Sequence, residues 1–357
     1  MKHQDGSFDS ALSERAGIVQ PGNVNPYYIS KRETGGLQTK EYYMDGILKG
    51  NRSVLGRAIT LIESQHPDHQ TLAQEIIECC LPHTGKSVRL GITGVPGAGK
   101  STVIETLGVQ LVKKGSKLAV LAVDPSSERS KGSILGDKTR MEELSGMENA
   151  FIRPSPSAGS LGGVTRKTSE TIVLCEAAGF DTIFVETVGV GQSETAVYNM
   201  VDFFLLVQIA NAGDELQGIK RGIMEMADMI VINKADGDNI QQSKLAKSQF
   251  ANALHLFPPT ESGWIPPVET CSAYTGDNID KLWQTVQEYV QYTKNNGYFE
   301  HNRRMQKQRT LKQSVEEMLL YNFYNDPVRA KQLEIALNDV VTEKISPYIA
   351  AQKLIHP

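Results

Sequence analysis

The sequence lacks the features that mark membrane-spanning and secreted proteins. No run of about 18 apolar residues occurs, which argues against a membrane span. The start of the chain holds no apolar stretch behind a basic segment, so we expect no secretory signal. It carries Asp5, Asp9 and Glu14 beside only Arg15, whereas a mitochondrial presequence is rich in Arg and poor in acids. We therefore expect a cytoplasmic protein.

Excess positive charge is also missing. The 357 residues include 37 Lys and Arg against 41 Asp and Glu, which gives a net charge of −4 without any basic block. A protein that grips nucleic acid needs a surface stripe of Lys and Arg. We therefore expect neither nucleic acid nor a membrane among its partners.

Cysteine is scarce, and its spacing is uninformative for metal binding. The four residues form no CxxC pair and stand apart from any histidine cluster, so neither a disulfide framework nor a structural zinc site is predicted: Cys79, Cys80, Cys175 and Cys271. His66 and His69 have a spacing that would place two metal ligands on one helix face. Pro67 lies between them and favours a turn instead.

Apolar patterning divides the chain into four parts. Residues 1–43 are polar, without an apolar period, and predict a flexible extension. Residues 44–85 have helical spacing that is interrupted at Pro67, which predicts a hairpin of two helices. Residues 86–290 alternate short apolar runs with helical stretches, and residues 291–357 form amphipathic helical series that could cover their own sheet or a second subunit.

Five apolar runs in the third part predict β-strands: SVRLGITG, KLAVLAVD, DTIFVET, FFLLVQIA and MIVINKAD. Their hydrophobicity is continuous rather than alternating, which is typical of strands buried on both faces. A segment of helix length separates each pair, as in βαβ units. The predicted fold class is therefore α/β, a doubly wound and mostly parallel sheet with helical N- and C-terminal extensions.

The first apolar run leads into a phosphate-binding motif. Residues 94–101 read GVPGAGKS, which matches GxxxxGK[ST] between a predicted strand and a predicted helix. Glycines let the main-chain N–H groups wrap a β-phosphate at the helix N-terminus, Lys100 offsets the β- and γ-phosphate charge, and the Ser101 hydroxyl ligates Mg²⁺. The residues expected on the phosphates are Gly94, Pro96, Gly97, Ala98, Gly99, Lys100, Ser101 and Thr102.

Two further motifs favour guanine over adenine. Asp236, after the run MIVI, can accept hydrogen bonds from N1–H and the exocyclic amine of guanine, donors that adenine lacks. Asn233 would brace the loop, and the Ala273 N–H could donate to O6. The residues expected to hold the base of GTP or GDP are Asn233, Lys234, Asp236, Ser272, Ala273 and Tyr274.

Acidic residues follow two of the predicted strands at the same edge of the sheet. Glu186 can hold the Mg²⁺ shell or its water, and Gly189 can bring its N–H to a γ-phosphate. Asp124 is placed as a direct or indirect Mg²⁺ ligand. Asp137 is either a switch ligand or the N-cap of a helix. The predicted metal site is Ser101, Asp124, Asp137 and Glu186.

Position 190 holds Val190, where Ras-like enzymes have the glutamine that orients the attacking water. We therefore expect the protein alone to hydrolyse GTP slowly. The polar, glycine-punctuated segment 211–222 follows another predicted strand at the active-site edge. Read from the residues alone, this segment is either a functional loop or structural filler.

Seven motifs occur in order: GVPGAGKST, AVDPSS, GSILGDKTRM, FIRPSPSAGSLGG, ETVGVGQSE, GDELQGIK and INKADGDN. Over about residues 44–350 the chain resembles the MeaB/ArgK-type GTPases, which belong to the SIMIBI class of P-loop proteins and are associated with methylmalonyl-CoA mutase. The resemblance implies that Lys100, Glu186 and Asp137 act in catalysis. It also makes segment 211–222 a switch, with working residues Asp214, Gln217 and Lys220.

The same resemblance implies a GTP-hydrolysing chaperone that gates adenosylcobalamin loading and protects an acyl-CoA mutase, which stimulates hydrolysis. It also implies a homodimer formed through the C-terminal helices. A metallochaperone GTPase for metal insertion is the alternative, although metal-handling Cys or His clusters near the phosphate loop are missing from the sequence. A nucleotide-dependent kinase is a third interpretation, which the guanine motif disfavours.

Overall fold

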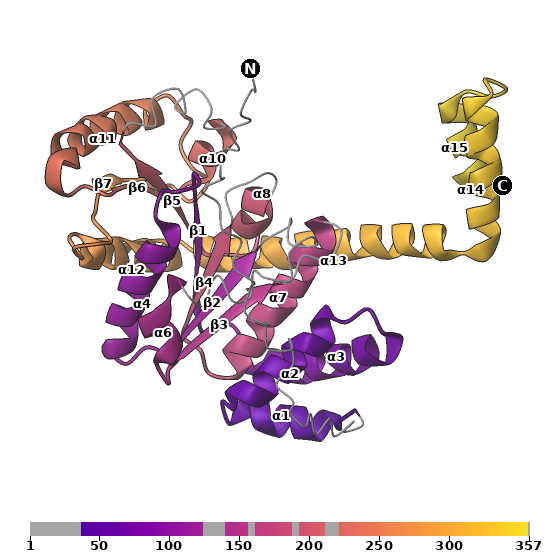
Figure 1. The fold of residues 1–357 in the computed structure, drawn as a ribbon, viewed down its shortest axis with the longest axis horizontal. Helices are drawn as coiled ribbons and strands as arrows, with labels where there is room; N and C mark the ends of the chain where they lie inside the picture. The colour runs from indigo at the N-terminus through magenta and orange to yellow at the C-terminus, as the bar shows by residue number, and fades with distance from the viewer. Residues whose placement is uncertain (1–36, 124–139, 156–160, 188–192, 211–220, 356–357) are drawn as a thin grey trace, which may run out of the picture. The chain divides into compact units, whose positions relative to one another are not determined.

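A computed structural model describes residues 37–123, 140–155, 161–187, 193–210 and 221–355. The chain separates into two units after Gln38, and the elements below belong to the unit that begins at Thr39. Its centre is a seven-stranded sheet in the order β3-β2-β4-β1-β5-β6-β7, in which every pair of neighbours is parallel (Figure 1). The predicted α/β fold class with a doubly wound sheet is confirmed.

The five predicted apolar runs form central strands of this sheet: β1 (Val88–Gly94), β2 (Leu118–Val123), β4 (Thr182–Thr187), β5 (Phe203–Ile209) and β6 (Met229–Asn233). Both edge strands, β3 (Ala150–Ser155) and β7 (Val268–Thr270), were missed by the sequence prediction. An edge strand tolerates Pro154 because one side of it needs no hydrogen-bond donors. The run in β7 is only three residues long, too short for a periodic signal.

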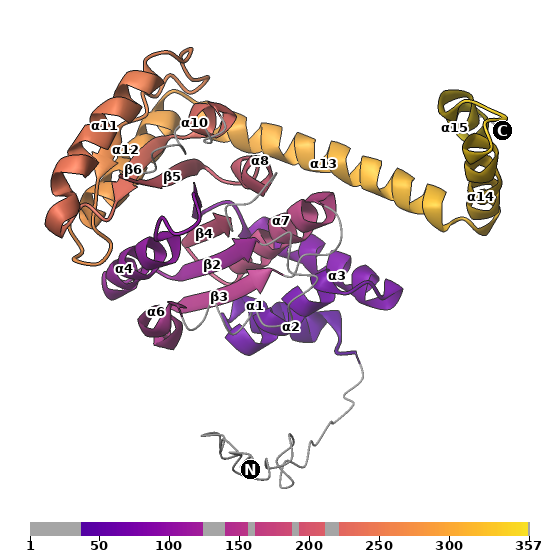
Figure 2. The same ribbon diagram turned by 45° about the horizontal axis from the view of Figure 1, so that its top comes forward.

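Helices cover both faces of the sheet. One face packs against α7 (Leu161–Ala177), α8 (Ser193–Tyr198) and the N-terminal helices. The other face packs against α4 (Lys100–Lys113), α6 (Glu142–Gly146) and α12 (Ile279–Asn295). Figure 2 shows these two layers on either side of β2 and β3. A third cluster joins β6 to α10 (Arg221–Met226) and α11 (Ile240–Leu254), with a short 3₁₀ turn, η3 (Gly237–Asn239), leading into α11.

Side chains alternate between the two layers along each buried strand. Ile183 and Val185 of β4 belong to the layer with α7, whereas Phe184 between them belongs to the layer with α4. All three are fully buried. Because both faces are covered, the strand carries no polar position within this stretch, and its sequence reads as one continuous apolar run.

Three helices precede the sheet, where the sequence predicted a hairpin of two. They are α1 (Lys40–Leu48), α2 (Arg52–Glu63) and α3 (Pro67–Cys80), followed by the 3₁₀ turn η1 (Leu81–His83). Helix α1 begins inside the segment that the sequence predicted to be flexible. The prediction missed its start because only Tyr43, Gly46 and Ile47 of this helix are buried, which leaves a weak apolar period. The break at Pro67 lies where the sequence indicated it.

The two histidines beside Pro67 make local contacts. His66 caps α3 by accepting from the Asp68 N–H at 3.3 Å, and His69 Nδ1 lies 2.9 Å from the Ser64 hydroxyl. Within the described residues, no group of three or more His, Cys, Asp or Glu side chains is placed to hold a metal ion. The cysteines are free thiols, and burial raises the pKa of Cys80 to about 11.

The C-terminal segment is helical, as its amphipathic series indicated. It forms α13 (Tyr298–Asn325), α14 (Pro327–Val341) and α15 (Pro347–Ile355), and α12 spans the boundary that the sequence placed at residue 290. Many of its apolar side chains are exposed in the single chain: Leu311, Val315, Met318, Leu319, Leu320, Tyr321, Tyr324, Ile335, Leu337 and Val341. Within the described ranges no helix combines the length and apolarity needed to cross a bilayer.

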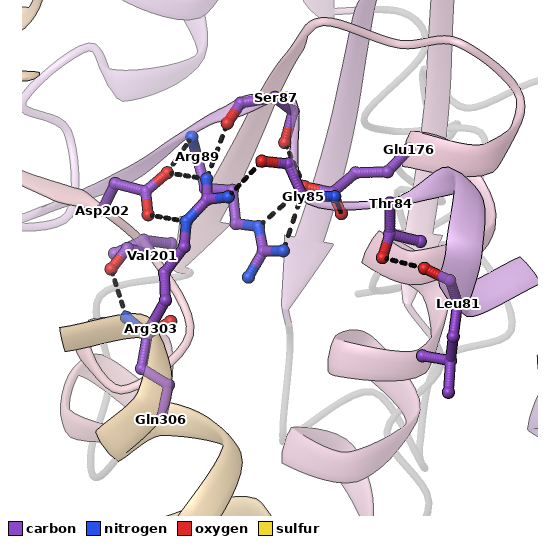
Figure 3. A network of polar contacts seen from close by, with 10 residues as sticks. All are labelled: Leu81, Thr84, Gly85, Ser87, Arg89, Glu176, Val201, Asp202, Arg303 and Gln306. Carbon is purple, nitrogen blue, oxygen red and sulfur yellow. Dashed lines mark hydrogen bonds and ion pairs between the residues drawn. The ribbon is translucent and has the colours of Figure 1, made fainter. Parts of the chain in front are cut away.

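An ion-pair network of half-buried arginines and buried carboxylates fixes the first turns of α13 to the sheet (Figure 3). Arg303 donates to both carboxylate oxygens of Asp202, at 2.8 and 2.7 Å. It also donates to the main-chain carbonyls of Gly85 and Ser87 at 2.8 and 2.6 Å. These partners precede β5 and β1, so Arg303 holds α13 at the amino ends of two central strands. Every charge here has an opposite charge or a carbonyl as its partner, which is the condition for burying charges at low cost.

The same network reaches α7 through a second ion pair. Arg89 of β1 donates to Glu176 Oε1 at 2.9 Å, and the Arg89 N–H donates to Asp202 at 2.8 Å. Burial alone would raise the pKa of Glu176, but the charge and hydrogen bonds of Arg89, together with hydrogen bonds from Ser87 and the Gly85 N–H, hold this pKa below the usual value. The edge of the sheet opposite to the phosphate motif is therefore pinned by two arginine–carboxylate pairs.

Asp228, the residue before β6, gives folding stability a pH dependence. It is buried, accepts the Phe204 N–H at 2.8 Å, and burial raises its pKa from 3.8 to about 7. Between these two values the folded chain holds a proton that the unfolded chain releases, so this residue lowers stability as pH rises from about 4 to 7. We expect Asp228→Asn to remove this loss, a gain on the order of a few kcal/mol at pH 8.

Thermal unfolding at pH 5, 6, 7 and 8 checks this expectation. The matched control is Asp181→Asn, since Asp181 also accepts a main-chain N–H, from Lys117 at 3.0 Å, but is exposed. The melting temperature of Asp228→Asn should depend less on pH than that of the wild type and of the control. Equal pH slopes in all three proteins would contradict the expectation.

Candidate functional site

The phosphate motif forms the connection between β1 and α4. Two of its glycines cannot be replaced without a steric clash. A Cβ on Gly94 would lie 2.0 Å from the Val207 carbonyl oxygen, and one on Gly99 would lie 2.6 Å from Asn233 Nδ2. Both have positive φ, at 153° and 86°. The loop therefore keeps its main chain within contact distance of β5 and of the base motif.

Lys100, the first residue of α4, lies over this loop. Its ammonium donates to the carbonyls of Gly94 and Val95 at 2.9 and 3.3 Å, and the side chain is buried. Burial lowers the pKa of Lys100, whereas Glu186 and Glu194 act to raise it. A buried ammonium at the N-terminus of a helix provides strong, fixed positive charge for an anion.

Ser101 and Glu186 come together at the carboxyl ends of β1 and β4. The Ser101 hydroxyl donates to Glu186 Oε1 at 3.1 Å, and Glu186 is buried. The strands pair in register up to Ile92 and Glu186, and the Thr187 hydroxyl donates to that of Thr93 at 2.9 Å. Hydroxyl and carboxylate oxygens are the ligands that Mg²⁺ prefers. These two residues fit a magnesium ion beside the phosphate loop.

Sequence reasoning missed one acidic residue near this centre. Glu194, in the first turn of α8, is buried and interacts electrostatically with Lys100. Its position inside the motif ETVGVGQSE was the available signal, but nothing in that motif indicates that Glu194 acts on Lys100 in the folded chain. Arg140, just before α6, also interacts with Lys100, and it lowers the pKa of the lysine.

The base motifs are joined to the phosphate loop by Asn233. Its amide Nδ2 donates to the Ala98 carbonyl at 2.8 Å, and its Oδ1 accepts the Ala273 N–H at 3.0 Å. Ser272 donates through its hydroxyl to Asp236 Oδ2. The structure thus brings together the end of β6, the loop after β7 and the phosphate motif, three segments separated widely in sequence.

One predicted contact has a competing acceptor within the protein. The sequence suggested that the Ala273 N–H donates to O6 of guanine, but in the structure it donates to Asn233. An N–H group committed to one buried acceptor is not free for a second acceptor at full strength. Asn233 therefore also holds the Ala273 N–H, the group that the sequence analysis expected to bind guanine O6.

Several predicted residues lie outside the described residues. These are the metal candidates Asp124 and Asp137, the γ-phosphate contact Gly189, and the switch residues Asp214, Gln217 and Lys220. The predicted residues that the structure does bring together are the phosphate loop with Lys100, the pair Ser101 and Glu186, and the loops of Asn233, Asp236 and Ala273. All of them meet at the carboxyl edge of a parallel sheet, where such folds bind ligands.

This fold and site define a P-loop nucleotide-binding protein. The family model of the methylmalonyl Co-A mutase-associated GTPase MeaB matches residues 55–327. The chain belongs to this family of GTPases, as its motifs indicated.

Named relatives agree with this assignment. A probable GTPase of Mycobacterium tuberculosis is 50% identical over 306 residues, which cover 86% of this chain and 91% of the relative. The methylmalonic aciduria type A homolog, a mitochondrial protein of Mus musculus, is 44% identical over 340 residues, 91% of this chain and 82% of its own. A crystal structure titled LAO/AO transport system kinase superposes with a TM-score of 0.72 at 37% identity, and covers 90% of this chain and 99% of that chain.

Proposed function

We propose that this protein is a GTP-dependent chaperone of an adenosylcobalamin-dependent acyl-CoA mutase, in particular methylmalonyl-CoA mutase. The observation that carries the proposal is the single constellation of Lys100, Ser101 and Glu186 with the base loops, in a chain of this family. Its role would be to gate adenosylcobalamin loading and to protect the mutase, working as a homodimer in the cytoplasm. The exposed apolar side chains of α13 to α15 support a second copy as the dimer partner.

GTP would place its phosphates on residues 94–102, where the N-terminus of α4 and Lys100 supply positive charge. Bound Mg²⁺ would neutralise phosphate charge during hydrolysis, with Ser101 and Glu186 as its contacts and Asp124 and Asp137 as further proposed ligands. Glu186, which accepts the Ser101 hydroxyl at 3.1 Å, would also be able to orient a water molecule through a hydrogen bond. The Lys100 ammonium would stabilise the negative charge on the phosphate oxygens while the bond between the γ-phosphorus and the leaving oxygen breaks.

Hydrolysis by the chain alone should be slow, because Val190 cannot orient water. The mutase would stimulate hydrolysis through the segment of Asp214, Gln217 and Lys220, which follows β5 in the sequence. We expect phosphate release from GTP to rise at least about tenfold when the mutase is added, with ATP as the inactive control. A GTP rate indifferent to the mutase would contradict the partner while leaving the nucleotide site intact.

Lys220→Ala separates signalling from binding. The variant should retain the GDP affinity of the wild type and lose the stimulation by the mutase. Lys244→Ala, which removes an exposed lysine of α11, is the matched control and should be stimulated like the wild type. Full stimulation of Lys220→Ala would remove this residue from the switch.

A further inference from the structure

In the loop of residues 272–276, the base loop, one main-chain N–H group has no acceptor among the described residues. Of the five consecutive N–H groups from Ser272 to Gly276, four have an acceptor within the protein: Ser272 donates to the Asp277 carbonyl at 3.1 Å, Ala273 to Asn233 Oδ1 at 3.0 Å, Thr275 to the Ser272 hydroxyl at 3.1 Å and Gly276 to the Ser272 carbonyl at 2.9 Å. Among the described residues, the Tyr274 N–H has no acceptor, and Tyr274 is 90% exposed.

The peptide that carries this donor is held from its other side by α4. The Thr106 hydroxyl donates to the Ala273 carbonyl at 2.7 Å, across 167 positions of sequence. Threonines inside helices usually donate to the carbonyl one turn back. Thr285 of α12 does so to Lys281 at 3.0 Å, and Thr293 to Tyr289 at 2.8 Å. Thr106 instead reaches out of its helix, and so ties the helix of the phosphate loop to the base loop.

This tie sets the direction of the Tyr274 N–H. In a trans peptide the carbonyl of one residue and the N–H of the next point in opposite directions, and the described chain has no cis peptide bond. With the Ala273 carbonyl turned toward α4, the Tyr274 N–H points away from α4. Ser272, two residues before Tyr274, donates a hydrogen bond from its hydroxyl to the Asp236 carboxylate. An acceptor, the Asp236 carboxylate, and a donor of fixed direction, the Tyr274 N–H, therefore lie in neighbouring loops.

That pairing complements the edge of guanine. Guanine presents the acceptor O6 next to the donors N1–H and N2–H, so a carboxylate and a neighbouring N–H group satisfy all of them. Adenine carries an amino group at the position of O6. This amino group and the main-chain N–H are both donors, so neither would be satisfied by the other. The base loop therefore needs an N–H group that its own structure has not already used.

We propose that the Tyr274 main-chain N–H donates to O6 of guanine and that Thr106 is the positioning residue that aims it. This inference rests on the guanine site proposed above, and it replaces the Ala273 N–H as the donor. Thr106 thereby makes base recognition depend on the placement of α4, whose first residues hold the phosphates.

The test measures dissociation constants of the purified full chain for nucleoside diphosphates that differ at the purine edge. GDP and IDP both keep O6, whereas the diphosphate of 2-aminopurine riboside lacks it. Its weaker binding can be followed by competition with a fluorescent GDP analogue. Thr106→Val removes the hydroxyl at nearly constant volume, Thr106→Ser restores it, and Thr285→Val removes a hydroxyl that bonds only within its own helix.

Thr106→Val should weaken GDP and IDP each about fivefold, the value of one neutral hydrogen bond, and leave the 2-aminopurine nucleotide unchanged. Thr106→Ser should recover the wild-type constants, and Thr285→Val should match the wild type throughout. An equal loss for all three nucleotides, or no loss for any of them, would overturn the role of Thr106. A wild-type protein that fails to prefer GDP over ADP would instead overturn the guanine site itself, whatever the variants do.

Discussion

Lys100→Ala is expected to lower GTP hydrolysis at least about a hundredfold and to weaken nucleotide binding. The side chain is buried at the start of α4 and lies over the phosphate loop, where it bonds to the Gly94 and Val95 carbonyls. Because the ammonium is buried, its charge would act on bound phosphates with little screening. The charge on the γ-phosphate oxygens redistributes in the transition state, so loss of the ammonium affects turnover more than binding.

Single-turnover phosphate release, with GDP affinity measured in parallel, separates the two effects. Lys167→Ala is a matched control, because Lys167 is also buried and donates to a main-chain carbonyl, that of Glu63 at 2.9 Å. Its bond joins α7 to α2 rather than to the phosphate loop. Wild-type turnover by Lys100→Ala would show that another cation stabilises the transition state.

The phosphate site could be read from the sequence because its requirements are local. Gly94 and Gly99 are needed where the main chain approaches β5 and Asn233, and only glycine fits there. Lys100 and Ser101 follow immediately, so strand, loop, ligands and helix lie within one short stretch. Continuous hydrophobicity fixed the central strands for the same reason, since a strand covered on both faces shows it in its own residues.

Contacts that depend on long-range packing were not accessible in this way. The bond from Thr106 to the Ala273 carbonyl exists because α4 lies beside the loop after β7, and nothing in either segment indicates the other. The same holds for Asn233, whose Oδ1 takes the N–H that the sequence assigned to guanine. The sequence prediction missed edge strand β3, which contains Pro154, and the start of helix α1, which has three buried residues, for a different reason. The local signals of these two elements are weak.

The Arg303 network is a further example. Its two arginines and two acids come from α13, β1, α7 and the residue before β5, four segments with no sequence pattern in common. An isolated Arg in an amphipathic helix is read as solvated, and only the folded chain shows that Arg303 is enclosed by carbonyl and carboxylate oxygens. Buried polar networks of this kind are specified by topology rather than by local spacing.

Asp236→Asn is expected to lower GDP affinity on the order of a hundredfold and to raise affinity for the xanthine nucleotide XDP. The carboxylate can accept from two donors of guanine, whereas an amide offers one acceptor and one donor. Its NH₂ group would face a donor of guanine, but it would meet the carbonyl O2 of xanthine. The Ser272 hydroxyl can still donate to the remaining oxygen, so the loop should keep its conformation.

Dissociation constants for GDP, XDP and ADP check this change of preference. Asp238→Asn is the matched control, since Asp238 lies two residues further on in η3 and is exposed. The control should bind GDP like the wild type. If Asp236→Asn still prefers GDP over XDP, the carboxylate does not read the purine edge, and the Asn233 and Ser272 contacts around it would be structural alone. An equal loss for GDP, XDP and ADP would point to a collapsed loop, which the Ser272 bond argues against.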